Sequence, residues 1–322
     1  MKMNIAFAGF RHAHIFPLYE SALKSDKFNV SGCFEEHEET RNEIEKNKGI
    51  ICNFSSYDEI LNNDNIKCVA IGDYYGKRGK MIIEALKHNK HVICDKPLCT
   101  SLDELEKIKD LSRQNNLKVC CMLDLRYMPQ VKTVKKLIEE NEIGKIHIAS
   151  FTGQHPLNYG VRPMWYFEEG KHGGTINDIA IHGIDLLRFL TGKNLTHINC
   201  AKTWNAFADK EPEFKDSAQF MIEMQDLAVM ADVSYAAPVF EGIMPTYWNF
   251  KFWGDKGMLF FSYCDNDIHI YKDKETVISC ENTPITLLDD FYNEIMGKTT
   301  ILNSEDILNS QEQVLKIQAF CD

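Results

Sequence analysis

The first 120 residues alternate short apolar segments with longer amphipathic ones, and this alternation restricts the possible folds more than any other feature. Residues 66–73 form the most continuously apolar segment, as expected for a strand buried on both faces of a sheet. Strands joined by helices at this spacing form right-handed crossovers and a parallel sheet. The pattern therefore predicts an α/β fold with a doubly wound parallel sheet. The predicted strands are residues 3–9, 28–35, 50–54, 66–73, 91–97 and 118–124.

The pattern changes after about residue 124. A helix is predicted at 128–144, another at 175–192, and two more near the end of the chain. Between them lie strand-like segments separated by short turns, which predict an α+β domain with a largely antiparallel open sheet. A length of 322 residues also favours two domains, which we expect at 1–123 and 124–322. The strand-like segments are 145–154, 196–207, 216–224, 227–236, 246–254, 256–263 and 267–272.

Composition excludes several classes of protein. The formal net charge of −11 argues against a nucleic-acid partner, which needs a basic face. No apolar run approaches the roughly 20 residues that span a bilayer, and from MKMNIAFAGF we expect no signal peptide. The 11 cysteines are scattered with no C-x-x-C pair, so we expect reduced thiols in a cytoplasmic protein that binds no membrane.

The segment AGFRHAHI follows the first predicted strand, where a dinucleotide-binding turn would read G-x-G-x-x-G. Gly9 is in place, but Arg11 and His14 replace the second and third glycines. The next helix would present its N–H groups to a pyrophosphate, and Glu35 at the end of the second strand could accept the ribose hydroxyls, favouring NAD over NADP. Arg11 could crowd the cofactor or pair with its phosphates. An ordinary glycine-containing loop is the alternative.

Lys96 is a second candidate, in the sequence Asp95-Lys96-Pro97 after a predicted strand. Open α/β sheets bind ligands at the carboxyl ends of their strands. Pro97 restricts the backbone of Lys96 and would hold its side chain in a defined direction. A solvated surface lysine is the alternative.

The third candidate is the helix in GGTINDIAIHGIDLLRFLTG. Asp178, His182 and Asp185 fall on one stripe, opposite an apolar face, and Gly-Gly precedes them. Two structural explanations compete: Thr175 and Asp178 have the spacing of a capping box, and His182 could be a hydrogen-bonded core histidine.

A metal site is a further alternative for these residues. Asp178, His182 and His155 could hold zinc, and His12 and His14 form H-x-H. Such a site would leave the nucleotide features unexplained, so we predict no metal.

Together these residues resemble the glucose–fructose oxidoreductase/inositol dehydrogenase (Gfo/Idh/MocA) family of nicotinamide-dependent oxidoreductases. The E-K-P of that family appears as Asp95-Lys96-Pro97, and its G-G-x-x-x-D-x-x-x-H-x-x-D helix as residues 173–185. RYMP, beginning at Arg126, resembles its R-F-x-P, and WGDKGML resembles its late G-x-x-G hairpin. The chain departs from the family at the glycine-rich turn, at Gly72-Asp73-Tyr74-Tyr75 in place of Thr-Pro, and at Trp165-Tyr166 in place of Trp-Arg.

The resemblance implies an N-terminal NAD(P)-binding Rossmann domain and a C-terminal domain for substrate binding and oligomerisation. It implies a dehydrogenase that transfers hydride between NAD and a sugar, cyclitol or related polyol. His182 would be the general base, Lys96 would stabilise the alkoxide, and Asp178 would orient the substrate or His182. The remaining cofactor contacts would be Gly9, Phe10, Arg11, His12, Glu35, Asp73, Tyr74, Asp95 and Pro97, with Arg126, His155 and Trp165 on the substrate.

Three further expectations follow from the resemblance. The open sheet of the second domain would form a homodimer or homotetramer. An NAD-retaining glycosidase, which oxidises, eliminates and reduces in one cycle, is one alternative function. A sugar- or nucleotide-sensing regulator without catalysis is another.

Overall fold

The computed structural model describes residues 2–242, 247–280 and 285–321. Its chain divides into two compact units. The first comprises Met1–Met122, Glu168–Gly173 and Ile285–Gln311, and the second comprises Leu123–Phe167, Gly174–Pro284 and Glu312–Asp322. The chain passes from the first unit to the second after Met122, next to the domain boundary predicted at 123/124. The division into domains 1–123 and 124–322 stays a prediction. Two later segments return to the first unit.

The first unit is built on a five-stranded sheet in the order β2-β1-β3-β4-β5, with every pair parallel. β3 is buried throughout, as its continuous apolar sequence predicts. This arrangement confirms the doubly wound Rossmann sheet. The strands are β1 (Met3–Ala8), β2 (Phe28–Phe34), β3 (Cys68–Ile71), β4 (His91–Cys94) and β5 (Val119–Cys121).

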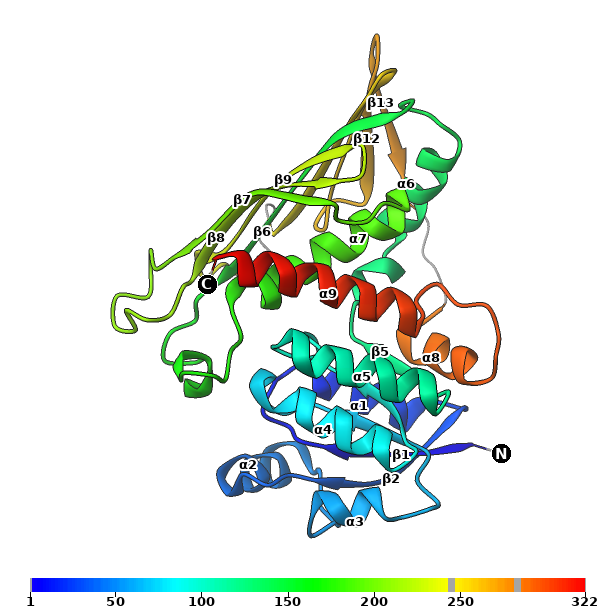
Figure 1. The fold of residues 1–322 in the computed structure, drawn as a ribbon, viewed down its shortest axis with the longest axis vertical. Helices are drawn as coiled ribbons and strands as arrows, with labels where there is room; N and C mark the ends of the chain where they lie inside the picture. The colour runs from blue at the N-terminus through cyan, green and yellow to red at the C-terminus, as the bar shows by residue number, and fades with distance from the viewer. Residues whose placement is uncertain (1, 243–246, 281–284, 322) are drawn as a thin grey trace. The chain divides into compact units, whose positions relative to one another are not determined.

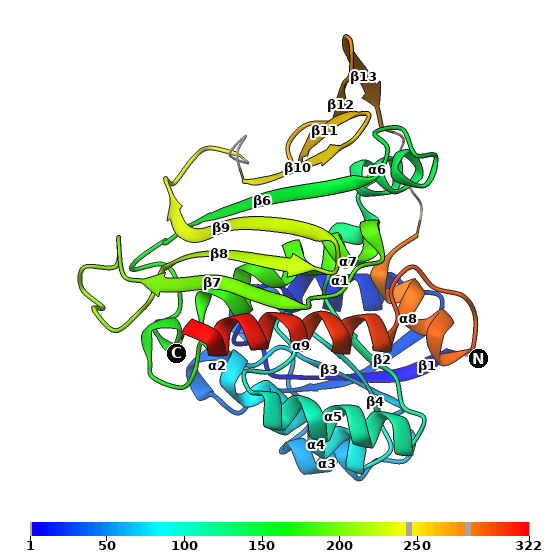
Figure 2. The same ribbon diagram turned by 45° about the horizontal axis from the view of Figure 1, so that its top comes forward.

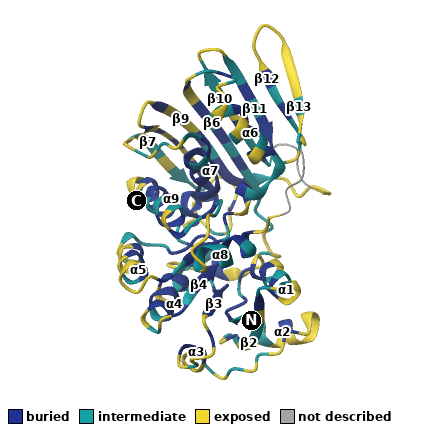
Figure 3. Ribbon diagram, turned by 90° about the vertical axis from the view of Figure 1, so that its right-hand side faces the viewer, coloured by how far each residue is buried: buried dark blue, intermediate teal, exposed yellow. Residues whose placement is uncertain are grey.

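Helices cover both faces of this sheet. α4 and α5 lie side by side on one face, and α1 lies on the other (Figure 3). Ser101 and Ser56 cap α5 and α3, each accepting the backbone N–H three residues on, as the sequence favours. The helices of this unit are α1 (Ile15–Lys24), α2 (Glu38–Lys48), α3 (Tyr57–Leu61), α4 (Tyr75–Lys87), α5 (Leu102–Gln114) and α8 (Leu287–Ile295).

The strand predicted at 50–54 is wrong. The chain there runs beside β2, with Phe54 N–H donating to the Cys33 carbonyl at 3.2 Å. The second contact uses a side chain instead of the backbone: Asn53 Oδ1 accepts the Cys33 N–H at 2.9 Å. The side chain of Asn53 replaces the ladder bond that would have made a strand.

The second unit contains an eight-stranded sheet in the order β13-β12-β11-β10-β6-β9-β8-β7, which Figure 2 shows fanned open. β6 and β9 pair in parallel and all other neighbours pair antiparallel, so the prediction of a largely antiparallel sheet is confirmed. The sequence did not predict β13, and Thr246, expected to begin β10, lies outside the described residues. The strands are β6 (Ile146–Pro156), β7 (His197–Trp204), β8 (Ser217–Met224), β9 (Leu227–Ala237), β10 (Trp248–Gly254), β11 (Gly257–Ser262), β12 (Asp267–Tyr271) and β13 (Glu275–Ser279).

Helices line one face of this sheet. The helix predicted at 175–192 starts as a π-helix, η3 (Ile176–Ala180), and continues as α7 (Ile181–Thr191). A Cβ at Gly183 would lie 2.2 Å from the Phe151 ring of β6, so glycine is needed for α7 to approach the sheet this closely. The other helices are η1 (Asp124–Tyr127), α6 (Pro129–Glu139), η2 (Met164–Phe167) and α9 (Ser304–Cys321), of which α9 begins in the first unit and ends in the second (Figure 1).

Candidate functional site

The turn after β1 has the backbone that a dinucleotide-binding turn requires. Gly9 has φ +81°, and a Cβ there would lie 2.8 Å from both Cβ and N of Asp73. Its N–H donates to the Phe34 carbonyl at 2.9 Å, and the His12 N–H donates to the Gly72 carbonyl at 3.0 Å. The first turn of α1 carries no acidic side chain that would repel a phosphate. These features fit a bound dinucleotide in spite of the missing glycines.

Glu35 is held against this turn instead of projecting into solvent. It is buried, and its two carboxylate oxygens accept the N–H of Phe10 at 2.6 Å and of His37 at 2.8 Å. Burial raises the pKa of Glu35, although these two N–H donors oppose the shift. Arg11 lies over the Tyr74 ring, with Cζ 5.6 Å from its centroid. The ribose contact predicted for Glu35 stays a prediction. The ribose hydroxyls would bind a carboxylate that already accepts the N–H groups of Phe10 and His37.

Asp73 also carries a polar network. It accepts the Tyr74 N–H at 2.8 Å and the Lys77 ammonium at 2.9 Å. Lys77 pairs at the same time with Glu36. This network lies directly beside Gly9. It occupies the position at which the family to which this chain was compared has Thr-Pro.

A buried charge cluster lies behind the turn. His12 Nδ1 contacts the Asp95 carboxylate, and the Tyr75 hydroxyl lies 3.0 Å from His12 Nε2. The Arg78 guanidinium lies 3.4 Å from Asp95, and His14 Nδ1 lies 3.3 Å from it. Burial lowers the pKa of His12 to about 4. Burial would raise the pKa of Asp95, but the neighbouring His12 and Arg78 hold it well below its usual value.

This cluster contains His12 and His14, which the sequence offered as possible metal ligands. Among the described residues, His12, His14 and Asp95 bring their ligand atoms within 4.8 Å of one another. Arg78 already supplies a positive charge to the same carboxylate, so we interpret the cluster as a buried ion-pair network. The trio His155, Asp178 and His182 is not grouped in this way in the part of the chain that the structure describes.

Lys96 is the second residue after β4 and is buried, as expected for a side chain fixed near the end of a strand. The Lys96–Pro97 peptide bond is cis. Arg78, which is completely buried in α4, donates Nη1 to the carbonyls of Asp95 at 3.0 Å and Pro97 at 3.1 Å, and also to that of Lys96. Sequence reasoning missed Arg78, although a charged residue on the apolar face of a helix is a detectable signal.

Asp178 is positioned by a tyrosine from the sheet. The Tyr235 hydroxyl of β9 donates to Asp178 Oδ2, and both residues are buried. Burial and the Asp178 carboxylate raise the pKa of the Tyr235 phenol well above its ordinary value, so it remains a donor. Thr175 makes no side-chain cap here and donates instead to the Lys215 carbonyl. The capping-box explanation for Asp178 is therefore wrong.

The Asp/His stripe does not point away from the core, which corrects the simple helical-wheel expectation. Asp178, His182 and Asp185 are all buried. Asp185 forms a two-bond pair with Arg126, at 2.8 Å from Nε and 2.7 Å from Nη2. This pair joins α7 to η1. The substrate contact predicted for Arg126 stays a prediction, and Arg126 would have to make it while it is paired with Asp185.

Aromatic side chains surround the remaining polar residues. His155 Nε2 lies 2.7 Å from the Tyr247 hydroxyl, and the His155 ring packs edge-on to Trp248. The His182 ring packs against the same Trp248, with centroids 5.7 Å apart. Trp165 is buried and stacked on Tyr166 at 4.1 Å. Their predicted contacts with a substrate stay predictions.

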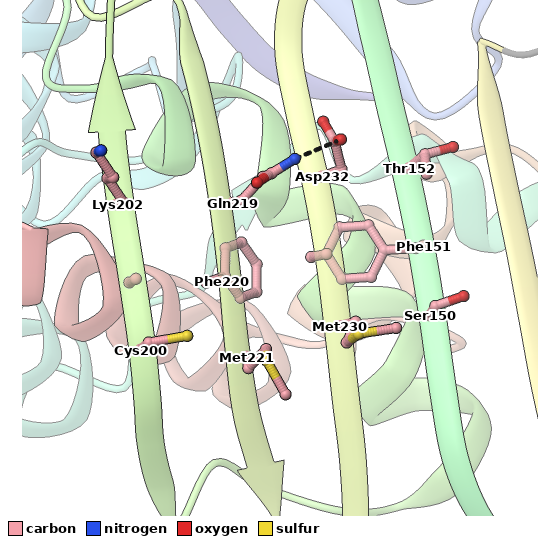
Figure 4. Close-up of a pocket in the computed structure, with 12 residues that line it drawn as sticks. Ser150, Phe151, Thr152, Cys200, Lys202, Gln219, Phe220, Met221, Met230 and Asp232 are labelled. Carbon is pink, nitrogen blue, oxygen red and sulfur yellow. Dashed lines mark hydrogen bonds between the residues drawn. The ribbon is translucent and has the colours of Figure 1, made fainter.

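The opposite face of the eight-stranded sheet is open. Four strands, β6, β7, β8 and β9, line a shallow hollow of about 610 Å³ there. Met221 and Met230 are about half exposed, and Gln219 donates to Asp232 at 3.0 Å across the same strands (Figure 4).

Two further features of the chain are its cysteines and the apolarity of its helices. All 11 cysteines are free thiols, and most of them are buried. No helix in the described residues has the length and apolarity that crossing a membrane requires.

Two family models match the chain. The "Oxidoreductase family, NAD-binding Rossmann fold" model matches residues 3–123, and the "GFO/IDH/MocA C-terminal domain" model matches residues 131–260. Together they account for most of the chain. The chain belongs to the Gfo/Idh/MocA oxidoreductase family.

Two of the relatives are named dehydrogenases. Levoglucosan dehydrogenase of Pseudarthrobacter phenanthrenivorans is 30% identical over 155 residues, which are 47% of this chain and 39% of that protein. Glucose-6-phosphate 3-dehydrogenase of Bacillus subtilis is 25% identical over 283 residues, which are 84% of this chain and 78% of that protein. The match to the first relative thus spans only about two fifths of its length.

Solved structures share the fold over the full chain. The aldose–aldose oxidoreductase of Caulobacter crescentus superposes with a TM-score of 0.82 at 16% identity, covering 98% of this chain and 96% of that chain. At this identity the similarity establishes the fold.

Proposed function

We propose that the chain is a nicotinamide-dependent dehydrogenase that transfers a hydride between NAD and a hydroxyl-bearing carbon of a sugar, cyclitol or related polyol. The observation that carries this proposal is the η3–α7 helix, where Asp178 is fixed by Tyr235 and His182 follows one turn later. The sugar dehydrogenases among its relatives support the same class of substrate.

The proposed roles follow from the chemistry of each side chain. Bound nicotinamide would accept or supply the hydride. His182 would take the hydroxyl proton during oxidation, which is typically worth about 10²–10⁴ in rate. The Lys96 ammonium would stabilise negative charge on the same oxygen, and Asp178, held by the Tyr235 hydroxyl, would orient a substrate hydroxyl.

The preference for NAD over NADP is part of the proposal. Glu35 and Glu36 both lie at the end of β2, and a carboxylate there disfavours a 2′-phosphate. Arg11 opposes this effect, since a guanidinium near the same turn could attract that phosphate.

A titration with NADH and then NADPH, followed by quenching of protein fluorescence, tests the cofactor proposal. Mass spectrometry of the purified protein should come first, to detect nucleotide that co-purifies. Tight NADH binding, weak NADPH binding and NAD reduction with a polyol are the expected results. Tightly retained cofactor without consumption of free NAD would point to the glycosidase alternative. Binding of neither nucleotide would refute the dehydrogenase.

We also propose that the open sheet face pairs with a second copy of the chain. The exposed Met221 and Met230 at the hollow support this, because apolar side chains gathered on a sheet face are stabilised by burial. Light scattering should give a dimer or tetramer, and the variant Met221→Glu/Met230→Glu should be smaller. A monomeric wild-type protein would contradict this part of the proposal.

A further inference from the structure

A hollow of about 340 Å³ opens at one end of the eight-stranded sheet, where β6 and β9 end and β10 begins. Pro156 and Ala237, the last residues of β6 and β9, pair with each other there. Tyr263 follows β11 and donates its N–H to the Trp248 carbonyl at 2.9 Å, which fixes it beside the first residue of β10. The described residues that line the hollow carry no charge, and they include Pro156, Ala237, Pro238, Phe240, Tyr247 and Tyr263.

Aromatic rings form much of the wall of this hollow. The rings of Tyr247 and Tyr263 meet edge to face, with centroids 5.5 Å apart and planes at 75°. Phe240 is 54% exposed, and Pro156 and Pro238 add flat apolar surface. A hollow of this volume is at the small end of the range for small-molecule sites. Its lining favours an uncharged ring, because a charged group would lose its water there without gaining an opposite charge.

Tyr247 connects this hollow to the proposed chemistry. Its hydroxyl lies 2.7 Å from His155 Nε2, and Pro156 of the hollow directly follows His155 in β6. The neighbouring Trp248 packs edge-on to the His155 ring at 5.8 Å and to the His182 ring at 5.7 Å. These residues all belong to the second unit. A substrate whose reacting hydroxyl lies at His182 would therefore extend past His155 into the hollow if it carried a second ring.

We propose that the hollow is a subsite for a second, uncharged ring, and that the substrate is a glycoside. This inference rests on the proposed dehydrogenase function and narrows its substrate class. A sugar ring and an aromatic ring both present flat apolar surface that packs against tyrosine and phenylalanine rings. A free monosaccharide lacks the second ring and gains none of this contact, so it should bind more weakly than its ring-bearing glycoside.

KM and Kd should be compared for glucose, galactose and mannose, each as free sugar, methyl glycoside and phenyl glycoside in both anomeric forms, and for cellobiose and maltose. We expect phenyl glycosides or disaccharides to bind the wild type at least about fivefold more tightly than methyl glycosides, the value of one aromatic contact. Phe240→Ala and Tyr263→Ala should remove most of this advantage and leave the methyl glycosides nearly unchanged. Tyr263→Phe should keep the advantage, because the ring remains. A preference for phenyl glycosides alone would identify an aromatic ring, and one for disaccharides alone a second sugar.

The control variant Phe207→Ala removes a phenylalanine of nearly equal exposure, 53%, from the same unit and should keep the wild-type preference. A wild type that binds no phenyl glycoside or disaccharide better than the methyl glycosides would overturn the inference. Equal losses for methyl and phenyl glycosides in Phe240→Ala would also overturn it, because Phe240 would then only support its loop. Failure of the dehydrogenase proposal is distinguishable. In that case no sugar would be oxidised, while calorimetry would still detect Phe240-dependent binding of a phenyl glycoside or disaccharide.

Discussion

The turn after β1 and the η3–α7 helix depart from sequence expectation in opposite ways. The turn lacks two of its three motif glycines, yet Gly9 keeps the left-handed backbone and the close approach to Asp73. The helix keeps every motif residue, yet it begins as a π-helix and buries the stripe expected to face away from the core. A motif that works through backbone N–H groups tolerates side-chain changes. A motif that works through side chains depends on partners contributed by other elements.

His182→Ala would test the helix most severely. If His182 accepts the hydroxyl proton, kcat should fall by about 10²–10⁴-fold. NADH affinity should not change, since His182 is not among the residues proposed to hold the cofactor. Steady-state kinetics and an NADH titration measure both effects.

His197→Ala, at an exposed position of β7, serves as the control and should behave as wild type. A kcat within tenfold of wild type in His182→Ala would remove the general-base assignment and revive the interpretation of His182 as a core histidine.

Breaking the Arg126–Asp185 pair would show whether Asp185 has a structural role. Both side chains are buried, so Asp185→Ala should cost about 3–5 kcal/mol of unfolding free energy, since it leaves a buried guanidinium without its carboxylate. Urea denaturation of each single variant and of Arg126→Met/Asp185→Leu measures this cost.

The double variant should recover much of the stability, because neither charge is then left alone. If it also keeps a wild-type KM, then the predicted contact between Arg126 and substrate is wrong.

Tyr235→Phe would remove one donor from Asp178 and leave the ring against Arg162. We expect kcat/KM to fall by about 10- to 100-fold, the value of a hydrogen bond to a charged group. The carboxylate keeps its place but loses the donor that holds it. Tyr271→Phe, on β12, is the matched control and should behave as wild type. A kcat/KM equal to that of the wild type in Tyr235→Phe would mean that Tyr235 only fills space.

Particular residues explain how far the sequence could predict this molecule. Periodicity predicted the order of strands and helices, because it reflects which faces are buried, and spacing alone placed Lys96 at the end of β4. Spacing could not identify the partners of the site. Tyr235 lies 57 residues from Asp178, and Arg126 lies 59 residues from Asp185, so only the folded chain brings the members of each pair together. Arg78 could have been noticed as a charged residue on the apolar face of α4, but its three carbonyl partners beyond β4 could not be predicted.

Gly9→Ala would test the turn. A left-handed backbone costs a non-glycine residue about 1–2 kcal/mol, and here the new Cβ would also collide with Asp73. Gly49→Ala is a matched control, because Gly49 has φ +66° but nothing within 4 Å of its would-be Cβ. Thermal unfolding should show a larger loss for Gly9→Ala, and only this variant should weaken NADH binding. Equal losses and unchanged NADH binding would mean that the close approach to Asp73 is unimportant.

Arg11→Gly restores the second motif glycine and should have the smallest effect. If Gly9 and the Glu35–Phe10 bond already set the backbone, the added glycine has little left to correct. Loss of one partly exposed charge near the cofactor phosphates should then change NADH affinity by less than about fivefold. The NADH titration used for the wild type measures this directly. A gain of tenfold or more would show that Arg11 obstructs the cofactor, and that the turn depends on its side chains as much as the helix does.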